Sequence, residues 1–282
     1  MQIALVVNFT NPQAINTAVE VIKVISSCGA RVLMLSSTEK YIESPDVSYI
    51  PDENLLFESC DVVVTVGGDG TIIRTAKFAS LMDKPIIGVN LGRIGFVAEL
   101  EPTEINMLEK VLKGDYTLMK RMVLGIEVEG KEKETSFIAI NDAVISRGAL
   151  SRIIEFDVSV EGEKIATYRA DGLLFSTPTG STAYALSAGG PVIDPKLSLI
   201  ELTPVCPHSL TARSVLFTDD TVLSVECKSS DTAYLTVDGQ ESLPINEGEK
   251  LVIKASAHTL NMINLKEKNF YRIVGEKLRD GK

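Results

Sequence analysis

The feature that most constrains the fold is a glycine-rich turn between a strand and a helix. Residues 61–66 form a short apolar, β-branched run, which predicts a buried strand. The sequence Gly-Gly-Asp-Gly-Thr follows at 67–71, and apolar residues then recur at helical spacing over 72–82. A strand, a glycine turn and a helix in that order indicate an α/β fold.

The composition of this turn suits a site that binds an anion. Three glycines leave no Cβ to keep a ligand from the backbone, and the first amides of the following helix attract negative charge. Asp69 stands in the middle of the turn, where its carboxylate would repel phosphate. Two interpretations stay open: Asp69 accepts a proton, binds a hydroxyl or meets a phosphate-bound metal, or it caps the helix.

The composition is that of a globular protein. The chain has 282 residues, enough for two domains, and 45% of them are hydrophobic against 23% charged. No apolar run approaches the roughly 20 residues that a membrane-spanning helix needs, so we expect no membrane partner. Residues 1–8 lack a basic leader and indicate a first strand rather than a signal peptide, which favours the cytoplasm.

Charge and cysteine content argue against several classes of protein. The 28 Lys and Arg against 38 Asp and Glu give a net charge of −10, which disfavours nonspecific binding to nucleic acid. The cysteines are far apart and include no Cys-x-x-Cys pair, so neither a zinc site nor a disulfide scaffold is indicated. Each is expected to be a small buried hydrophobic residue: Cys28, Cys60, Cys206 and Cys227.

Residues 1–115 are predicted to form an N-terminal open parallel α/β domain of Rossmann-like type. Strands and helices alternate along this part, as expected for a parallel sheet covered by helices. Strands are expected at 2–8, 31–35, 61–66 and 85–90, helices at 11–28, 54–59, 72–82 and 104–113, and a loop at 46–51. Ligands of such sheets bind at the carboxyl ends of the strands, where the turn at 67–71 and a second glycine turn at 91–96 both lie.

Residues 116–260 are predicted to form a C-terminal all-β domain that resembles a β-sandwich. Short alternating or β-branched runs are joined by turn residues, with one helical interruption near 181–188. The expected strands are 116–129, 137–145, 153–160, 164–168, 173–177, 215–217, 222–227, 233–237 and 251–255. The more basic segment 261–282 is expected to be a strand and then a helix, a tail that packs back on the N-terminal domain.

The second domain carries a dense run of small and hydroxylated residues over 176–191. Its hydroxyls and open amides suit a polar, flat ligand, although a capped helix in a glycine-rich loop has the same composition. Asn141-Asp142 lies in an otherwise apolar strand and is either a satisfied bend or a pair that binds hydroxyls. Asp238-Gly239 indicates a hairpin turn, and His208 a hydrogen-bonded loop histidine rather than a metal ligand.

Taken together, these motifs resemble those of the NAD kinases. The resemblance is carried by the turns at 67–71 and 91–96, Asn141-Asp142, Asp171-Gly172 and the run 177–191, and it continues through 203–210. The glycine–Asp turn is also found in diacylglycerol-type lipid kinases and phosphofructokinases. The specific part is the sequence Thr-Pro-Thr-Gly-Ser-Thr-Ala-Tyr that begins at Thr177.

The resemblance implies ATP-dependent phosphorylation of the adenosine-ribose 2′-hydroxyl of NAD, which yields NADP. In that family, the residue at the position of Asp69 contacts the attacking hydroxyl and acts as general base. The residues implied for NAD binding are Asp69, Gly70, Phe96, Asn141, Asp142, Asp171, Thr182, Ala183, Tyr184 and Ser187. Those implied for the phosphates are Gly67, Gly68, Gly70, Thr71 and Arg74.

The resemblance also implies co-substrates and partners. ATP would bring Mg²⁺ or another divalent metal to screen the phosphates, polyphosphate is an alternative donor, and the enzyme would be a homodimer or homotetramer. The family usually has Asn-Glu where this chain has Asn141-Asp142, and the shorter carboxylate reaches less far. A lipid kinase and a non-catalytic dinucleotide sensor are the rival interpretations. The hydroxyl-rich run disfavours the first, and the presence of Asp69 disfavours the second.

Overall fold

The computed structural model describes residues 1–92, 95–131, 135–148, 153–228, 232–266 and 270–279. The chain divides into two compact units, one formed by Met1–Lys120 and Thr259–Lys282, the other by Arg121–His258. The domain limits expected from the sequence, at 115 and 260, stay a prediction. Arg93-Ile94 of the second glycine turn, and 267–269 and 280–282 of the expected tail, lie outside the described residues.

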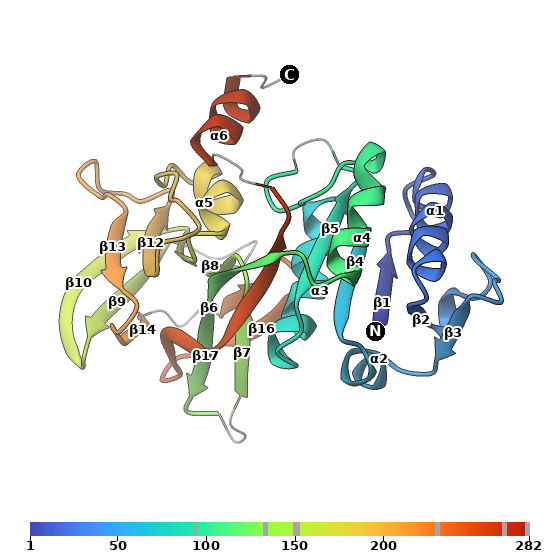
Figure 1. Ribbon diagram of the computed structural model, residues 1–282. Helices are drawn as coiled ribbons and strands as arrows, with labels where there is room; N and C mark the ends of the chain where they lie inside the picture. The colour runs from blue at the N-terminus through green and yellow to red at the C-terminus, as the bar shows by residue number, and fades with distance from the viewer. Residues whose placement is uncertain (93–94, 132–134, 149–152, 229–231, 267–269, 280–282) are drawn as a thin grey trace. The chain divides into compact units, whose positions relative to one another are not determined.

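The first unit is built on a parallel sheet of short apolar strands (Figure 1). They are β1 (Gln2–Val7), β2 (Arg31–Leu35), β3 (Val47–Ile50), β4 (Val62–Gly67) and β5 (Ile86–Asn90), in the order β5-β4-β1-β2-β3. Both faces of the sheet are buried: Val62 and Val64 of β4 belong to one core cluster, and Val63 between them is also buried. Such doubly buried, β-branched strands are typical of parallel sheets. The predicted open parallel α/β fold is confirmed.

Helices cover this sheet. They are α1 (Ala14–Ser27), α2 (Glu53–Ser59), α3 (Asp69–Leu81) and α4 (Leu108–Leu112), with short 3₁₀ helices at Ser36–Thr38 and Pro102–Met107. The expected C-terminal helix is α6 (Phe270–Arg279), and its packing on the N-terminal domain stays a prediction. α1 packs against β1 and α4, and α2 packs against α3, where the Phe57 and Phe78 rings stack at a centroid distance of 5.4 Å. The prediction of a loop at 46–51 is wrong, because strand β3 lies there and pairs with β2.

The second unit consists of two antiparallel sheets. Its strands are β6 (Thr117–Glu129), β7 (Thr135–Ala139), β8 (Asp142–Arg147), β9 (Ile154–Val160), β10 (Glu163–Ala170), β11 (Gly172–Ser176), β12 (Leu199–Val205), β13 (Val215–Thr218), β14 (Leu223–Lys228), β15 (Ala233–Val237), β16 (Glu241–Ile245) and β17 (Lys250–Asn264). One sheet has the order β13-β12-β11-β8-β15-β16; the other contains β10-β9-β14-β17 with β6 and β7. β17 runs on into the first unit, where Met262 pairs with Ile86.

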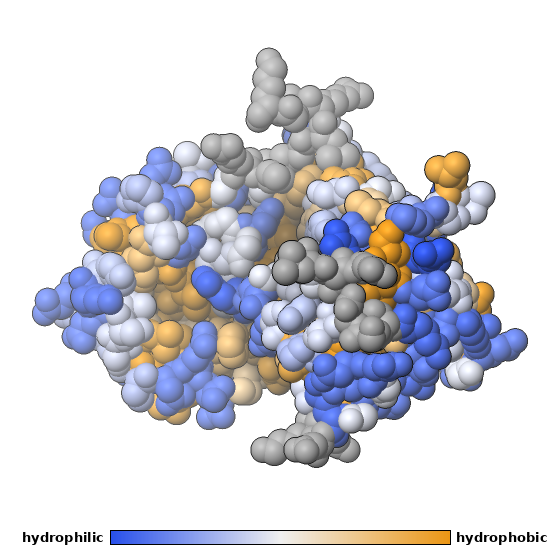
Figure 2. Space-filling view, turned by 180° about the vertical axis from the view of Figure 1, so that it is seen from behind, coloured by the Kyte–Doolittle hydropathy of each residue, from blue (hydrophilic) through white to orange (hydrophobic). Residues whose placement is uncertain are grey.

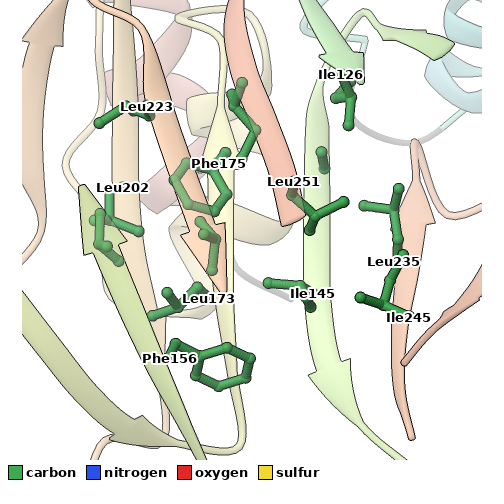
Figure 3. Close-up of a cluster of buried hydrophobic side chains, with 14 of the residues drawn as sticks. Ile126, Ile145, Phe156, Leu173, Phe175, Leu202, Leu223, Leu235, Ile245 and Leu251 are labelled. Carbon is green, nitrogen blue, oxygen red and sulfur yellow. The ribbon is translucent and has the colours of Figure 1, made fainter. Parts of the chain in front are cut away.

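Alternation along the strands decides what each face of the six-stranded sheet contacts. Leu173 and Phe175 of β11 point into a large apolar core that both sheets share (Figure 3). Leu174, between them, faces the other side and packs with Ala185 of α5 (Tyr184–Ser187), the short helix of the predicted interruption. The predicted sandwich-like domain is confirmed. Its sheet carries α5 on the face turned away from the core.

Some local expectations are wrong. Cys60 and Cys227 are buried as expected, but Cys28 and Cys206 are exposed. Strands β12 and β16 were not expected at all. On the face that Figure 2 shows, hydrophobic areas stand among hydrophilic ones. Among the described residues, no helix is long and apolar enough to cross a membrane.

Candidate active site

The turn after β4 brings two glycine-rich segments backbone to backbone. β4 ends at Gly67, and α3 begins at Asp69 with Gly68 as its N-cap residue. A Cβ on Gly67 would lie 2.5 Å from Thr71 Oγ1, and a Cβ on Gly92 would lie 3.1 Å from the Gly68 Cα. A side chain at Gly67 would displace that of Thr71, and one at Gly92 would force the two segments slightly apart. The Thr71 N–H donates to the Gly68 carbonyl (2.9 Å), and the N–H groups of Asp69 and Gly70 come before the first intrahelical bond and lie in this turn.

Asp69 holds the second glycine turn. Its Oδ2 accepts a hydrogen bond from the N–H of Phe96 (3.0 Å), and its Oδ1 accepts one from the N–H of Val97 (3.2 Å). The Asp69 side chain does not cap α3. The interpretation of Asp69 as a helix cap is therefore wrong. A carboxylate has about four lone-pair sites, so Asp69 can accept a hydroxyl hydrogen in addition to these two bonds.

Asn90 fixes the same turn from the end of β5. It is buried, its Oδ1 accepts the N–H of Gly92 (2.9 Å), and its Nδ2 donates to Glu101 Oε1 (3.2 Å). Gly95 has a φ of +64°, and a Cβ there would lie 2.6 Å from Asn90 Nδ2, so this position requires glycine. Sequence reasoning missed Asn90, although a polar residue at the end of an apolar strand was a usable signal.

The residues expected to bind phosphate lie in and next to this turn. Thr71 is buried, and a Cβ on Gly70 would meet nothing within 4 Å, so space is open above that residue. Arg74 is exposed on α3, one turn further along. Burial raises the pKa of Glu53 at the start of α2, and the charge of Arg74 lowers it in part. The guanidinium of Arg74 therefore lies close enough to Glu53 to act on its carboxylate.

The second unit contains a cavity of about 760 Å³. Of the residues expected to bind NAD, five line it: Asn141, Asp142, Asp171, Ala183 and Tyr184. Thr182 and Ser187 lie on either side of Ala183 and Tyr184 in the chain but do not line the cavity, while Asp69, Gly70 and Phe96 belong to the first unit. Lining residues that were not predicted as site residues include Arg147, Val205, Cys206, Thr236 and Asp238.

Asp238 holds the backbone of the Asn141-Asp142 pair. Its carboxylate accepts hydrogen bonds from the N–H groups of Ile140 (2.9 Å), Asn141 (2.8 Å) and Asp142 (3.1 Å). Asp238 sits at the tip of the β15–β16 hairpin with a φ of +49°, and its own N–H donates to the Asp142 carbonyl (2.9 Å). The expected hairpin turn therefore also clamps the bend before β8.

This clamp leaves the side chains of the pair free. Asn141 Oδ1 is buried and has no hydrogen-bond partner. Asp142 is 5% exposed and lines the cavity, and within the described part of the chain no hydrogen bond reaches its carboxylate. Burial, together with a smaller contribution from the nearby Asp238 carboxylate, raises the pKa of Asp142 to about 7. Buried polar atoms without partners are costly, so both side chains are suited to a polar ligand.

An ion pair forms another part of the lining. Arg147 Nε donates to Asp171 Oδ1 at 2.7 Å, and each side chain is about one-third exposed (33% and 36%). Their backbones are also joined, because the Arg147 N–H donates to the Asp171 carbonyl. Arg147 was missed in the sequence, since nothing local links it to a residue 24 positions away.

The hydroxyl-rich run uses several of its hydroxyls for its own folding. Thr177 Oγ1 donates to the Ile140 carbonyl (2.7 Å), and Ser181 Oγ donates to the Pro178 carbonyl (2.8 Å) and accepts the N–H of Ile193 (3.0 Å). Both residues are fully buried. The loop is thereby fixed, and it presents Ala183 and the half-exposed Tyr184 to the cavity.

Comparison with protein families matches both parts of the chain. Residues 3–116 match the model of the ATP-NAD kinase N-terminal domain, and residues 140–265 match that of the ATP-NAD kinase C-terminal domain. The NAD kinase of Geotalea daltonii is 35% identical over 289 residues, covering 99% of each chain. The NAD kinase of Moorella thermoacetica is 36% identical and covers 99% of this chain and 90% of its own.

Solved structures share the fold. The yeast NADH kinase complexed with NADH superimposes with a TM-score of 0.91 at 24% identity and covers 100% of this chain and 88% of its own. An NAD kinase from Archaeoglobus fulgidus in complex with ATP gives a TM-score of 0.76 at 23% identity, with 99% of both chains covered.

Proposed function

Since this chain belongs to the NAD kinase family, we propose that Asp69 is its general base and that the cavity of the second unit binds NAD. The enzyme is an ATP-dependent kinase that converts NAD to NADP. One observation carries the catalytic assignment. The Asp69 carboxylate is held by two backbone N–H groups at the glycine-rich start of a helix, and it keeps lone pairs for a further donor.

In the proposed reaction, the adenosine-ribose 2′-hydroxyl attacks the γ-phosphorus of ATP. The bond between that oxygen and phosphorus forms, the bond from phosphorus to the β,γ-bridging oxygen breaks, and ADP leaves. The hydroxyl proton passes to the Asp69 carboxylate. Phosphoryl transfer requires positioning and charge stabilisation more than covalent catalysis, so a fixed carboxylate is suited to orient the hydroxyl.

We assign the phosphates of ATP to the turn after β4. The glycines at 67, 68 and 70 leave the backbone accessible, and the N-terminus of the 13-residue helix α3 adds its partial positive charge. Thr71 and the exposed Arg74 would contribute a hydroxyl and a guanidinium. ATP enters as its complex with Mg²⁺ or another divalent cation, and polyphosphate stays an alternative donor.

We assign NAD to the cavity that contains Asn141 and Asp142. A dinucleotide offers ribose hydroxyls and an adenine edge, and these are the partners that the unpaired Asn141 Oδ1 and the buried Asp142 carboxylate lack. Asp171, Ala183 and Tyr184 line the same space. Thr182, Ser187, Gly70 and Phe96 stay predicted NAD contacts.

A second copy of the chain is the proposed protein partner. β13 is an edge strand of the six-stranded sheet, and Val215 and Leu216 on it are 38% and 49% exposed. Leu210, shortly before β13 in the chain, is 96% exposed. An exposed apolar edge strand favours pairing with another strand, which supports a homodimer or homotetramer. A cytoplasmic location stays a prediction.

The test is a coupled assay of purified protein with NAD, ATP and Mg²⁺, in which an NADP-specific dehydrogenase reports the product. Calorimetric titration with NAD runs in parallel. Product formation supports the proposal. Saturable NAD binding without product would instead favour the interpretation as a non-catalytic dinucleotide sensor. If the protein neither forms NADP nor binds NAD, the interpretation as a lipid kinase would be favoured.

A further inference from the structure

Within the described ranges, Glu201 of β12 is the one acidic residue that is completely buried. The proposed reaction does not use it. Its side chain is 0% exposed. Its Oε1 accepts a hydrogen bond from Thr203 Oγ1 (2.7 Å), and its Oε2 is buried without any partner. Glutamate is almost never fully buried unless it is paired, so this position needs an explanation.

The groups that contact Glu201 within the described residues carry no charge, and the titratable Asp142 stands in the same cross-strand row on the far side of Ser176. In the strand pairing, Ser176 of β11 and Leu216 of β13 stand opposite it. Thr203 is its hydrogen-bond partner, and Gly190 lies against Oε1, where a Cβ would approach to 2.0 Å. Among the described residues, Glu201 forms no ion pair and no hydrogen bond to a charged group. An ionised carboxylate is poorly tolerated in such surroundings, whereas a protonated one is tolerated.

Glu201 is on the same face of the six-stranded sheet as a residue that lines the cavity. Side chains alternate along a strand, so Glu201, Thr203 and Val205 share one face of β12. Val205 packs with the α5 cluster and lines the cavity. Glu201 is therefore four positions along the chain from the lining residue Val205, and it does not itself line the cavity.

Two chain segments that form the cavity meet at Glu201. The first is the turn after α5: the Gly190 N–H donates to the Ala185 carbonyl (2.9 Å), and α5 begins with the lining residue Tyr184. The absence of a side chain at Gly190 is what lets this turn lie on the Glu201 carboxyl group.

The second segment is the chain between β12 and β13. Thr203 Oγ1, which donates to Glu201, also shares a hydrogen bond of 2.7 Å with Ser214 Oγ. Ser214 ends the segment that starts at Cys206, another lining residue. The Glu201–Thr203–Ser214 chain therefore joins the strand to the end of this segment.

We propose that Glu201 is a positioning residue: as a neutral carboxylic acid, it supports the turn after α5 and the segment before β13, and so sets the walls of the NAD cavity. This inference rests on the proposed assignment of NAD to that cavity. Burial also raises the pKa of Glu201, although the Thr203 hydrogen bond lowers it in part. The effect of burial is the larger of the two, so the net shift is upward, in the direction that favours a proton on the carboxyl group.

The test compares Glu201→Gln, which mimics the neutral acid, with Glu201→Leu, which removes both polar atoms. Glu226→Gln, an exposed glutamate on β14, is the matched control. Steady-state kinetics of the full chain with NAD and MgATP give KM and kcat separately. We expect Glu201→Gln and the control to keep the KM for NAD within about twofold, and Glu201→Leu to raise it about fivefold or more with little change in kcat.

Two further measurements address the proton directly. The infrared difference spectrum of wild type minus Glu201→Gln should contain a protonated carboxyl band at neutral pH. The stability of Glu201→Gln relative to wild type should rise as the pH increases above about 4.3, because a raised pKa means that the wild type loses stability through that range. Neither readout depends on activity, so both can be obtained even where Glu201→Leu fails to fold.

Three outcomes would overturn the inference. If Glu201→Gln raises the KM for NAD as much as Glu201→Leu, the negative charge is required. If folded Glu201→Leu leaves KM unchanged, Glu201 does not set the cavity walls. A band of an ionised carboxylate in the infrared difference spectrum would contradict the proposal that Glu201 is protonated. A wild type that makes no NADP and binds no NAD would instead refute the proposed function.

Discussion

Asp142→Asn should stabilise the enzyme at alkaline pH and destabilise it near pH 4, where only the cost of burying the amide remains. Burial, with a smaller contribution from Asp238, raises the pKa of Asp142 from 3.8 to about 7. The folded state therefore holds a proton that the unfolded state has released between these two values. The contribution of Asp142 to the free energy of unfolding is fully present below its unfolded-state pKa, and it is lost as the pH rises towards 7.

The size of the effect follows from this shift. Each pKa unit corresponds to about 1.4 kcal/mol, so a rise of roughly three units amounts to ~4 kcal/mol of lost stability above pH 7. Asparagine is neutral at every pH and avoids this loss, but burying its amide costs about 1–3 kcal/mol. We expect a net gain of about 2 kcal/mol at pH 8, measured as the unfolding free energy in urea.

Asp157→Asn is the control, since it should respond in the opposite direction. Hydrogen bonds from Lys164 and Thr167 hold the pKa of Asp157 below its ordinary value. Its contribution to stability is present at neutral pH and is lost as the pH falls through the folded pKa. If the stability difference between Asp142→Asn and wild type is the same at about pH 4.5 and pH 8, the reasoning on Asp142 is refuted.

Two further substitutions test the supports of the cavity. Asp238→Asn replaces an acceptor of three backbone N–H groups, so it should destabilise the second unit by about 1.5–3 kcal/mol in urea unfolding and raise the KM for NAD; unchanged values for both would contradict the clamp. Gly190→Ala places a Cβ 2.0 Å from Glu201 Oε1 and should cost about 1–3 kcal/mol of stability. Gly275→Ala, where a Cβ meets nothing within 4 Å, should be neutral or slightly stabilising in the same measurement.

The parts of the fold that the sequence predicts are those coded locally. The strand at 61–66 and the glycine turn after it depend on β-branching and on the missing Cβ, which neighbouring residues alone specify. β12 was missed because it contains Glu201, Thr203 and Pro204, which do not read as a buried strand. Its polar side chains are accommodated by a serine opposite and a glycine above, contacts that only the folded chain creates.

The candidate site shows the same limit. Asp69 and Asn141-Asp142 stand out in the sequence because polar residues interrupt apolar strands or glycine turns. What fixes them comes from elsewhere: Asp238 reaches Asn141 across 97 positions, and Phe96 reaches Asp69 across 27. Local patterns therefore indicate which residues are unusual. Tertiary hydrogen bonds decide which atoms of those residues remain available to a ligand.

The central claim is that Asp69 serves as the base, beyond its role of holding the second glycine turn. Asn90→Ala loosens the same turn but leaves the Asp69 carboxylate in place, so it is the matched control. The decisive measurement is kcat for NADP formation by Asp69→Asn, because an amide cannot accept the hydroxyl proton. We predict a loss of about 100-fold or more for Asp69→Asn and of less than about tenfold for Asn90→Ala. A kcat of Asp69→Asn close to that of the wild type, or equal to that of Asn90→Ala, would contradict the account.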